Sequence, residues 1–361
     1  MRIGILGAGQ LGRMMALSGI PLGLEFTMYD RSAEVPGAAV APIVTGRFDD
    51  HRRLARFAQG VDIVTFDWEN VPVESVRAIA KHAPVWPPPR ALAAAQDRLS
   101  EKRLFQRLGI PVAPYAAVST RAGLRLAIER LGTPGLLKTR RLGYDGKGQY
   151  LLRRAADADA AWAQLHGQPL LYECFVRFSR EVSLIGVRDR AGQQAFYPLA
   201  ANVHRDGILV ESRAPYRHAR LQHTAERYHR RLMQTLGYVG VLCVEYFVER
   251  GRLVANEMAP RVHNSGHWTI EGAATSQFEN HIRAIAGLPL GSTRPRGHAV
   301  MVNLIGRLPD RRALLGLTGA HLHDYGKAPR PGRKLGHLTA VAATARKRDR
   351  LAPRLLRIAP R

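Results

Sequence analysis

Runs of apolar residues alternate with amphipathic stretches along most of the chain, a pattern typical of proteins that mix helices and strands. Ile3–Leu6 is an apolar run of the buried type, followed by a glycine-rich turn, a helical stretch ending at Ser18 and the strand-like run Leu24–Tyr29. Val61–Phe66 is a further buried run, and a helical stretch over 73–82 follows it. This order predicts a parallel sheet with helices on its faces in the N-terminal region.

A proline-rich break at 86–89 ends the N-terminal region, and we place the first domain boundary near residue 95. Beyond it, Asp97 and Thr120 are typical N-cap residues, and they predict helices over 97–108 and 120–131. The other patterns in this region predict a helix at 155–165 and strands at 136–138, 150–152 and 170–176.

The third region is predicted to be rich in antiparallel strands. Val241–Val248 and Leu253–Met258 flank the turn Glu249-Arg250-Gly251 and predict a β-hairpin. The segment from Thr344 onward is basic and weakly patterned. The remaining patterns predict helices over 225–236 and 276–286 and strands at 181–184, 196–199, 208–210 and 299–304.

The predicted hairpin would carry one carboxylate on each strand. Glu245 and Glu257 would lie roughly opposite each other, with Asn256 adding a neutral oxygen. Carboxylates in largely apolar strands are costly to leave unpaired, and Mg²⁺ accepts carboxylates together with phosphate oxygens. The alternative is that both glutamates face water on an edge hairpin.

The segment after the hairpin favours a binding site, because it crowds polar groups into a short stretch containing proline and glycine. Such a composition suits a loop that presents hydrogen-bond donors to an anion. The side chains concerned are Arg261, His263, Asn264, Ser265, His267 and Trp268.

A second candidate is the glycine-rich loop at 143–149, which contains three glycines within six residues. Its exposed backbone N–H groups, with Arg140, Arg141 and Lys147 nearby, predict a cradle for phosphates. It is not a Walker loop, because no Gly-Lys-Ser/Thr sequence follows it. An ordinary glycine hairpin is the alternative.

Gly7, Gly9 and Gly12 form a GxGxxG pattern between the first strand and helix, and Asp30 ends the next strand. This pattern matches the dinucleotide-binding fingerprint, so a nicotinamide-dependent oxidoreductase is a rival hypothesis. The rival leaves the glycine loop and the paired glutamates unexplained. The loop at 67–72 follows a buried strand, where open α/β sheets bind ligands, although it could equally be a helix cap.

Composition changes this picture little. The chain has 361 residues, 46% of them hydrophobic, which predicts globular domains with real cores. With 54 Lys and Arg against 29 Asp and Glu, the net charge of +25 indicates anionic partners. The arginines are scattered, which argues against nucleic acid as the partner. The basic turn at 330–337 could grip a phosphate monoester or be solvated surface.

The two cysteines, Cys174 and Cys243, lie in apolar runs, as is typical of buried thiols in a reducing compartment. The N-terminal apolar run is too soon interrupted to be a signal peptide. No run approaches the ~18 apolar residues of a membrane span. We therefore expect a cytoplasmic protein that binds no membrane.

Six motifs carry a resemblance to a known family over nearly the whole chain. They are GAGQLGRM (7–14), ENVP (69–72), DRLSEKRLF (97–105), GYDGKGQ (143–149), NEMAPRVHNSGHWT (256–269) and RPGRKLGH (330–337). Together with a lysine on a strand and the two hairpin glutamates, they resemble the N5-carboxyaminoimidazole ribonucleotide synthases, a family of ATP-grasp ligases. The chain departs from the family pattern at Asp67-Trp68, at Cys174 and in a shorter segment after His337.

The resemblance implies an α/β (α+β) ATP-grasp fold. Its expected parts are a Rossmann-like domain over 1–95, a lid over 96–172, a C-terminal ATP-grasp subdomain over 173–300 and a small last segment over 301–361. The implied reaction is carboxylation of 5-aminoimidazole ribonucleotide by bicarbonate, driven by ATP through carboxyphosphate, with ADP and phosphate as products. This is a step of de novo purine biosynthesis. The implied cofactors are ATP and Mg²⁺, and the implied assembly is a homodimer.

The resemblance also assigns residues. Those expected to bind ATP are Arg98, Lys138, Gly143, Tyr144, Asp145, Gly146, Lys147, Gly148, Gln149, Glu173, Cys174, Phe175, Val176, Glu181, His204, Asn256 and Glu257. Mg²⁺ would be held by Glu245 and Glu257. The residues expected to act on bicarbonate are Arg261, His263, Asn264, Ser265 and Lys138. Those expected to bind the ribonucleotide are Gln10, Leu11, Glu69, Asn70, Tyr144, Asp145, Arg333 and Lys334.

Overall fold

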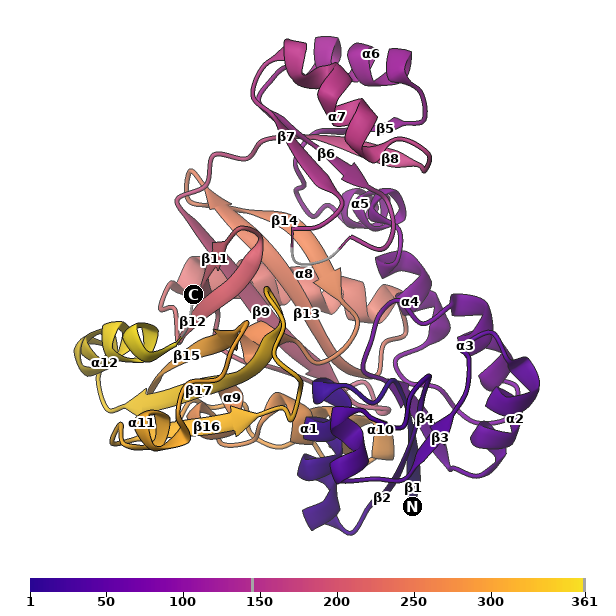
Figure 1. The fold of residues 1–361 in the computed structure, drawn as a ribbon, viewed down its shortest axis with the longest axis vertical. Coiled ribbons are helices and arrows are strands. Elements are labelled where there is room, and N and C mark those ends of the chain that lie inside the picture. Colours follow the sequence, from indigo (N-terminus) through magenta and orange to yellow (C-terminus); the bar gives the residue numbers. More distant parts are fainter. Residues whose placement is uncertain (144–145, 360–361) are drawn as a thin grey trace.

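The structure, a computed structural model, describes residues 1–143 and 146–359. Three β-sheets organise the described chain (Figure 1). The first is the predicted parallel sheet of the N-terminal region, in which the strands lie in the order β3-β2-β1-β4. The strands are β1 (Arg2–Leu6), β2 (Glu25–Asp30), β3 (Ile43–Thr45) and β4 (Ile63–Phe66). The helices of this region are α1 (Gln10–Gly19), α2 (His51–Gln59), α3 (Val73–Ile79) and α4 (Pro89–Ala95).

The second sheet is antiparallel, with the order β5-β8-β6-β7, and stands at the top of the molecule in Figure 1. The predicted caps are confirmed: the Asp97 side chain accepts from two backbone N–H groups of α5, and the Thr120 hydroxyl accepts from one of α6. The strands are β5 (Tyr115–Val118), β6 (Gly135–Thr139), β7 (Gln149–Leu152) and β8 (Leu170–Cys174). The helices are α5 (Arg98–Arg107), α6 (Arg121–Leu131) and α7 (Ala158–Leu165).

The third sheet has nine strands, in the order β14-β13-β9-β11-β12-β15-β17-β16, with β10 paired to β9 beside this path. Its strands are β9 (Arg180–Arg188), β10 (Gln194–Phe196), β11 (Ala200–Arg205), β12 (Ile208–Ala214), β13 (Gly240–Glu249), β14 (Arg252–Ala259), β15 (His298–Ile305), β16 (Ala320–Asp324) and β17 (Lys334–Ala342). Its helices are α8 (Ala219–Thr235), α9 (Thr269–Gly272), α10 (Gln277–Ala286), α11 (Arg311–Leu315) and α12 (Ala345–Ile358). The domain ranges expected from the sequence remain predictions.

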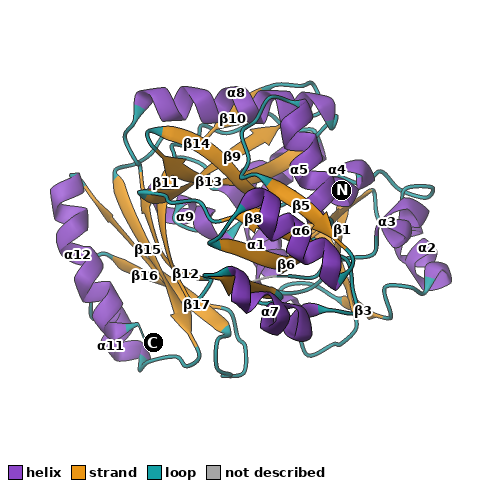
Figure 2. Cartoon of the chain, turned by 90° about the horizontal axis from the view of Figure 1, so that it is seen from above, coloured by secondary structure: helices purple, strands orange, loops and turns teal. Residues whose placement is uncertain are grey.

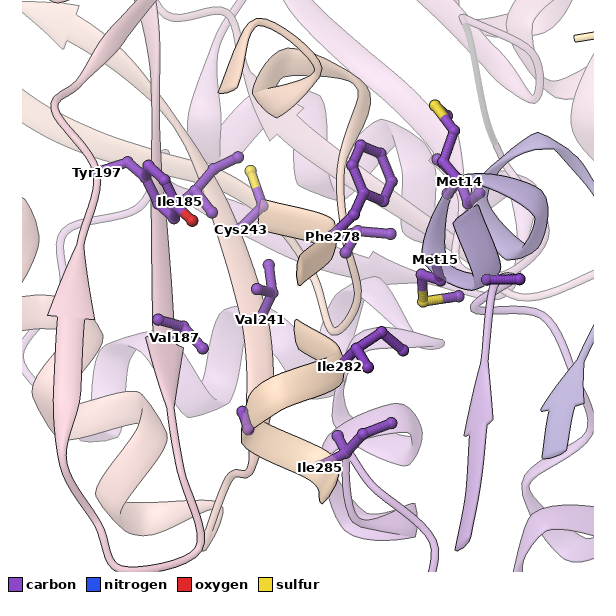
Figure 3. Close-up of a cluster of buried hydrophobic side chains, with 14 of the residues drawn as sticks. Met14, Met15, Ile185, Val187, Tyr197, Val241, Cys243, Phe278, Ile282 and Ile285 are labelled. Atoms are coloured by element: carbon purple, nitrogen blue, oxygen red, sulfur yellow. The ribbon is translucent and has the colours of Figure 1, made fainter. Parts of the chain in front are cut away.

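The largest core joins the first sheet to the third (Figure 3). Helix α10 lies between them: Phe278 and Ile282 pack with Val241 of β13 in the same buried cluster as Met14 and Met15 of α1. Each such fully buried apolar side chain stabilises the fold by about 1.5–3 kcal/mol. Helix α8 covers the opposite face of β9 and β13, through a separate cluster that includes Leu232 (Figure 2). The nine-stranded sheet is therefore covered on both faces.

Several predicted ends differ from the structure: the helix predicted over 73–82 ends at Ile79, the strand predicted at 170–176 ends at Cys174, and the helix predicted over 225–236 begins at Ala219. Three other predictions need larger corrections. The strand predicted at 196–199 is wrong beyond Phe196, because β10 ends there and β11 begins only at Ala200. The basic turn predicted at 330–337 is half strand, since β17 starts at Lys334. The weakly patterned tail is helix α12, which Thr344 caps through its side chain. Pro353 and many basic residues hide the apolar face that packs α12 on β15 and β17.

The GxGxxG loop is already filled by the protein's own carboxylates. Asp67, which is 7% exposed, accepts hydrogen bonds from the backbone N–H of Gly9 at 2.7 Å and of Gly12 at 3.2 Å. Asp30 accepts from Ala8 N–H at 2.8 Å. Gly7 has a φ of +91°, and a Cβ there would lie only 1.8 Å from Asp67 Oδ1. A dinucleotide phosphate would have to displace Asp67, so the oxidoreductase hypothesis loses its main support.

No helix in the described parts of the chain has the length and apolarity needed to cross a bilayer.

Replacing Asp67 by Ala should destabilise the protein, because the buried N–H groups of Gly9 and Gly12 would lose their acceptor. We expect a loss of about 1–3 kcal/mol in the free energy of unfolding, measured by urea denaturation. Asp67→Asn keeps one acceptor oxygen and should lose less. Equal stability of Asp67→Ala and the native protein would contradict this view of the loop.

Candidate active site

The β13–β14 hairpin brings its two carboxylates together as predicted. Glu245 pairs directly with Glu257 in the strand register, while Tyr246 pairs with Ala255. Asn256 is therefore the extra residue of a β-bulge, a feature that redirects side chains next to functional sites.

The hairpin turn and the bulge together set this register. Both loop residues have positive φ, +47° at Arg250 and +72° at Gly251, as a two-residue type I′ turn requires. Glycine adopts this conformation without strain. The turn places Glu249 opposite Arg252 and sets the pairing as far as Tyr246 and Ala255, and the bulge at Asn256 then shifts the register so that Glu245 meets Glu257.

The two carboxylates differ in their surroundings. Glu257 accepts a hydrogen bond from Arg98 Nη1 at 2.9 Å. Burial raises the pKa of Glu257, but the charge and hydrogen bond of Arg98 outweigh it and lower the pKa overall. Burial raises the pKa of Glu245, and the negative charge of Glu257 adds to this effect. Glu257 is therefore stabilised as a carboxylate, whereas ionisation of Glu245 is disfavoured by burial and by the charge of its neighbour.

A buried ion cluster joins the second sheet (β5 to β8, called the lid sheet below) to α5, whose Lys102 Nζ also donates to the Ala255 carbonyl of the hairpin at 3.4 Å. Lys138 Nζ of β6 lies 2.9 Å from one Glu173 oxygen, and Lys102 Nζ of α5 lies 3.4 Å from the other. Burial alone would raise the pKa of Glu173, but the two lysines lower it to about 2. The family resemblance placed Glu173 among the residues that bind ATP, and its ion pair with Lys102 was not predicted. The signal was present, because Lys102 lies beside Leu99 and Phe105 on the apolar face of α5.

Glu101 is a second buried carboxyl group that sequence reasoning missed. Its Oε1 accepts from the backbone N–H of Met258 at 2.6 Å. Burial, followed by the negative charge of Glu257, raises the pKa of Glu101 to about 8. Glu101 is therefore protonated at neutral pH, and it holds β14 against α5 without adding negative charge to the hairpin.

The strand beside the hairpin contributes a histidine–carboxylate pair. His204 Nδ1 on β11 is hydrogen-bonded to Glu181 on β9. Burial lowers the pKa of His204. The hydrogen bond to Glu181 and the negative charge of Glu245 outweigh burial, so the pKa of His204 is raised overall. Both residues were predicted to lie near the nucleotide, and the structure brings them to the same sheet as the glutamate hairpin.

The glycine-rich loop reaches the turn between β11 and β12. A Cβ at Gly146 would lie 2.7 Å from the carbonyl oxygen of Asp206, and the Gly148 carbonyl accepts from Thr139 N–H at 2.8 Å. Arg140 and Arg141 do not point at a phosphate here; they pair with Asp97 at 2.7 and 3.3 Å. The described flap residues are Gly143, Gly146, Lys147, Gly148 and Gln149, while Tyr144 and Asp145 lie outside the described residues.

The segment leading out of β8 is the part predicted to meet adenine. Two of its N–H groups are already used, because Cys174 N–H donates to Pro114 at 2.9 Å and Phe175 N–H to Pro134 at 3.1 Å. The Phe175 side chain is 40% exposed, and Val176 is half-buried.

The loop after the hairpin is held from two sides. Arg261 Nε donates to Glu69, which lies in the loop after β4. His263 N–H donates to Gln277 Oε1 at 3.0 Å, and His263 Nε2 lies 3.7 Å from Glu245 Oε1. Burial, helped by the charge of Arg261, lowers the pKa of His263 to about 3, so the ring is neutral. Asn264 exchanges two amide hydrogen bonds, at 2.7 and 3.0 Å, with Asn303 of β15.

The residues predicted to bind the ribonucleotide are only partly brought together. The charge of Lys334 acts on Glu245 and on His263, lowering the pKa of each. Arg333 instead donates to the Ala328 carbonyl at 3.2 Å. Leu11 is buried in the main core. Gln10, Glu69 and Asn70 are half-buried, and Tyr144 and Asp145, the last two of this group, lie outside the described residues.

Three family models match successive parts of the chain. A ribonucleotide synthetase preATP-grasp domain matches residues 1–96 and an ATP-grasp domain matches residues 103–278. A phosphoribosylaminoimidazole carboxylase C-terminal domain matches residues 299–350.

Comparisons of the whole chain with known proteins agree with these three matches. The chain is 49% identical to the N5-carboxyaminoimidazole ribonucleotide synthase of Pseudomonas aeruginosa over 343 residues, 95% of each chain. It is similar to the crystal structure of N5-carboxyaminoimidazole ribonucleotide synthetase from Thermus thermophilus, with 52% identity and a TM-score of 0.95 over 99% of both chains. The Aspergillus clavatus enzyme in complex with ADP and 5-aminoimidazole ribonucleotide gives a TM-score of 0.93 at 30% identity, over 99% of this chain and 98% of that one.

Replacing Glu173 by Gln should leave two lysines buried without a counter-charge. We expect a loss of about 3–5 kcal/mol in the free energy of unfolding, the range for breaking a buried ion pair. Adding Lys102→Met to this variant removes one unpaired charge and should recover part of the loss. If the double variant were less stable than Glu173→Gln, the ion cluster would not be the cause.

The same variant gives a pH test. The pKa of Glu173 falls from 4.5 to about 2 on folding, so its ionisation stabilises the native state fully above pH 4.5. This contribution is lost as the pH falls from 4.5 toward about 2. The stability difference between the native protein and Glu173→Gln, measured by urea unfolding at each pH, should therefore be constant near neutrality and shrink below pH 4.5. A difference that grows on acidification would contradict the assignment.

Proposed function

The chain belongs to the N5-carboxyaminoimidazole ribonucleotide synthases, a family of ATP-grasp ligases, and from this premise we propose how its residues share the chemistry. The enzyme uses ATP and bicarbonate to convert 5-aminoimidazole ribonucleotide to N5-carboxyaminoimidazole ribonucleotide in purine biosynthesis. The observation that carries this conclusion is the 49% identity over 95% of the chain. The roles of individual residues are our assignment.

We assign ATP to the space between the lid sheet and the β13–β14 hairpin. Lys138 and Arg98 would face the phosphates. Lys138 is oriented by its ion pair with Glu173, and Arg98 by its ion pair with Glu257. The contact of Gly146 with the β11–β12 turn supports a glycine flap that closes over the nucleotide. Glu181 and His204 would meet the ribose side, and the backbone from Glu173 to Val176 would meet adenine.

The residues present fit Mg²⁺. Glu245 and Glu257 are opposed in register, and their mutual repulsion contributes to the raised pKa of Glu245, a repulsion that a divalent cation would relieve. Among residues 1–143 and 146–359 no group of three or more His, Cys, Asp or Glu side chains is arranged to hold a metal. The remaining ligands would therefore come from ATP phosphates and water, which is the usual preference of Mg²⁺. The ion would neutralise charge on the phosphates.

We propose that the reaction runs through carboxyphosphate. A bicarbonate oxygen forms a bond to the γ-phosphorus of ATP while the bond from that phosphorus to the β,γ-bridging oxygen breaks, and ADP leaves. The exocyclic amine of the ribonucleotide then bonds to the carboxyl carbon, phosphate leaves and the nitrogen loses a proton. Phosphoryl transfer of this kind depends mainly on positioning and on charge stabilisation.

The loop from Arg261 to Ser265 is our candidate for holding bicarbonate and its phosphorylated form. Arg261 supplies a permanent positive charge, and the neutral His263 ring and the Asn264 amide supply hydrogen-bond donors. Water has to be excluded, because carboxyphosphate hydrolyses easily, and closure of the flap would provide this. Lys334, whose charge acts on Glu245, would lie on the ribonucleotide side.

The rival functions have less support. The dinucleotide hypothesis conflicts with the occupancy of the glycine loop by Asp67, and the nucleic-acid hypothesis rests on net charge alone. The homodimer and the cytoplasmic location expected from the family resemblance stay predictions.

Replacing Glu257 by Gln should reduce kcat by about a hundredfold or more, because a charge that aligns magnesium–ATP is lost. The fold should persist, since Glu257 lies at the open side of the hairpin and 41% of its side chain is exposed. Glu249→Gln on the same hairpin is the matched control and should retain activity. ADP release near the native rate by Glu257→Gln would count against our assignment of the metal.

Substrate omission gives a direct test of the reaction. ADP release should reach its full rate only when bicarbonate and 5-aminoimidazole ribonucleotide are both present. Glycinamide ribonucleotide with formate should not replace them. If that pair supported turnover, the chain would act as a sibling ligase; if NADH bound tightly by fluorescence titration, the oxidoreductase hypothesis would return.

A further inference from the structure

A chain of buried polar side chains runs behind the bicarbonate loop, across three strands of the large sheet. Ser212 Oγ on β12 donates to Asn202 Oδ1 on β11 at 2.8 Å. Asn202 Nδ2 donates to Ser183 Oγ on β9 at 3.0 Å. Ser183 Oγ donates to Ser265 Oγ in the loop at 2.8 Å. The exposed fractions of these four residues lie between 0 and 6%.

Each hydrogen bond fixes the direction of the next. The Ser183 oxygen accepts from the Asn202 amide, so its single hydrogen points to Ser265. Ser265 Oγ accepts that hydrogen, so its own hydrogen can go to His263 Nδ1, 2.9 Å away, which is a better acceptor than its other neighbour, Cys243 Sγ at 3.8 Å. The serine–asparagine relay, Ser212–Asn202–Ser183, therefore sets which atom donates at its far end.

The relay ends on one ring nitrogen of the histidine. The backbone N–H of Ser265 also points at His263 Nδ1, at 3.3 Å. With two donors directed at it, Nδ1 has to be the acceptor nitrogen, so the single proton of the neutral ring resides on Nε2. His263 Nε2 is the atom that faces Glu245 Oε1, at 3.7 Å.

We propose that Ser183, Asn202 and Ser212 are positioning residues that hold His263 in its Nε2–H tautomer. The ring then presents a hydrogen-bond donor to an oxygen of bicarbonate or of the transferred phosphoryl group, and it cannot take a proton at that atom. This inference rests on the proposed role of the Arg261–Ser265 loop. A purely structural role, in which the relay only joins strands, would satisfy buried groups but would leave the tautomer unimportant.

Ser183→Ala tests the relay. Without the Ser183 donor, the Ser265 oxygen becomes free to accept from His263 Nδ1–H. Only the Ser265 backbone N–H then opposes a proton on Nδ1, so the second tautomer becomes less unfavourable. We expect kcat/KM for bicarbonate to fall by about 10- to 100-fold, the range seen when a group that orients a site residue is lost, while KM for ATP changes little. Ser183→Thr keeps the hydroxyl and should restore most of the activity. Ser75→Ala is the matched control, because Ser75 is equally buried and donates to Phe48 of the N-terminal region.

A spectroscopic readout separates positioning from mere stability. In protein labelled with ¹⁵N-histidine, the His263 signals are identified by their loss in His263→Gln. The native spectrum should show Nε2 protonated and Nδ1 unprotonated, and Ser183→Ala should show both tautomers. The native spectrum needs no relay variant, so it remains informative even if Ser183→Ala fails to fold.

Two results would overturn the proposal. One is a native His263 protonated on Nδ1, and the other is a Ser183→Ala variant with the kinetics of Ser75→Ala. Failure of the proposed function is a different outcome: the native enzyme would then release no ADP in response to bicarbonate, whichever tautomer the spectrum showed.

Discussion

Buried negative charge is the constraint around which this protein is arranged. Carboxylates removed from water must meet cations or be protonated. Both pairing with a cation and protonation occur among the carboxylates around α5, β8 and β14. The buried Glu173 meets Lys102 and Lys138, the half-buried Glu257 meets Arg98, and the raised pKa of Glu101 favours its neutral form. Because these partners come from the lid sheet, helix α5 and the large sheet, the pairing of charges also holds the parts of the chain in register.

Local patterns were sufficient for much of the fold. The caps at Asp97 and Thr120, the type I′ turn at Gly251 and the pairing of Glu245 with Glu257 depend on residues near each other in the sequence. Such signals survive because the backbone conformation they require is set within a few residues. The candidate site was predictable to the same extent, since its hairpin and glycine loop are local structures.

Long-range partners were not predictable from the residues alone. Asp67 fills the glycine loop, although 58 positions separate it from Gly9. Ser183 and Ser265 meet only because strands and loop converge. Helix α12 was not predicted, because Pro353 and the arginines of this segment obscure its narrow apolar stripe. That stripe is recognisable only from the strands on which it packs. In each case the partner is supplied by tertiary structure rather than by neighbours in the sequence.

The placement of helix α10 also determines which of the three sheets share a hydrophobic core. Its apolar face belongs to a single core that includes α1 on one side and β9 and β13 on the other. The N-terminal sheet and the large sheet are therefore packed together as one body. The core of the lid sheet, by contrast, is confined to residues 116–172 and shares none of its members with that body. If the lid sheet moves when nucleotide enters or leaves, as we propose, it can therefore do so without disturbing the apolar core that the other two sheets share.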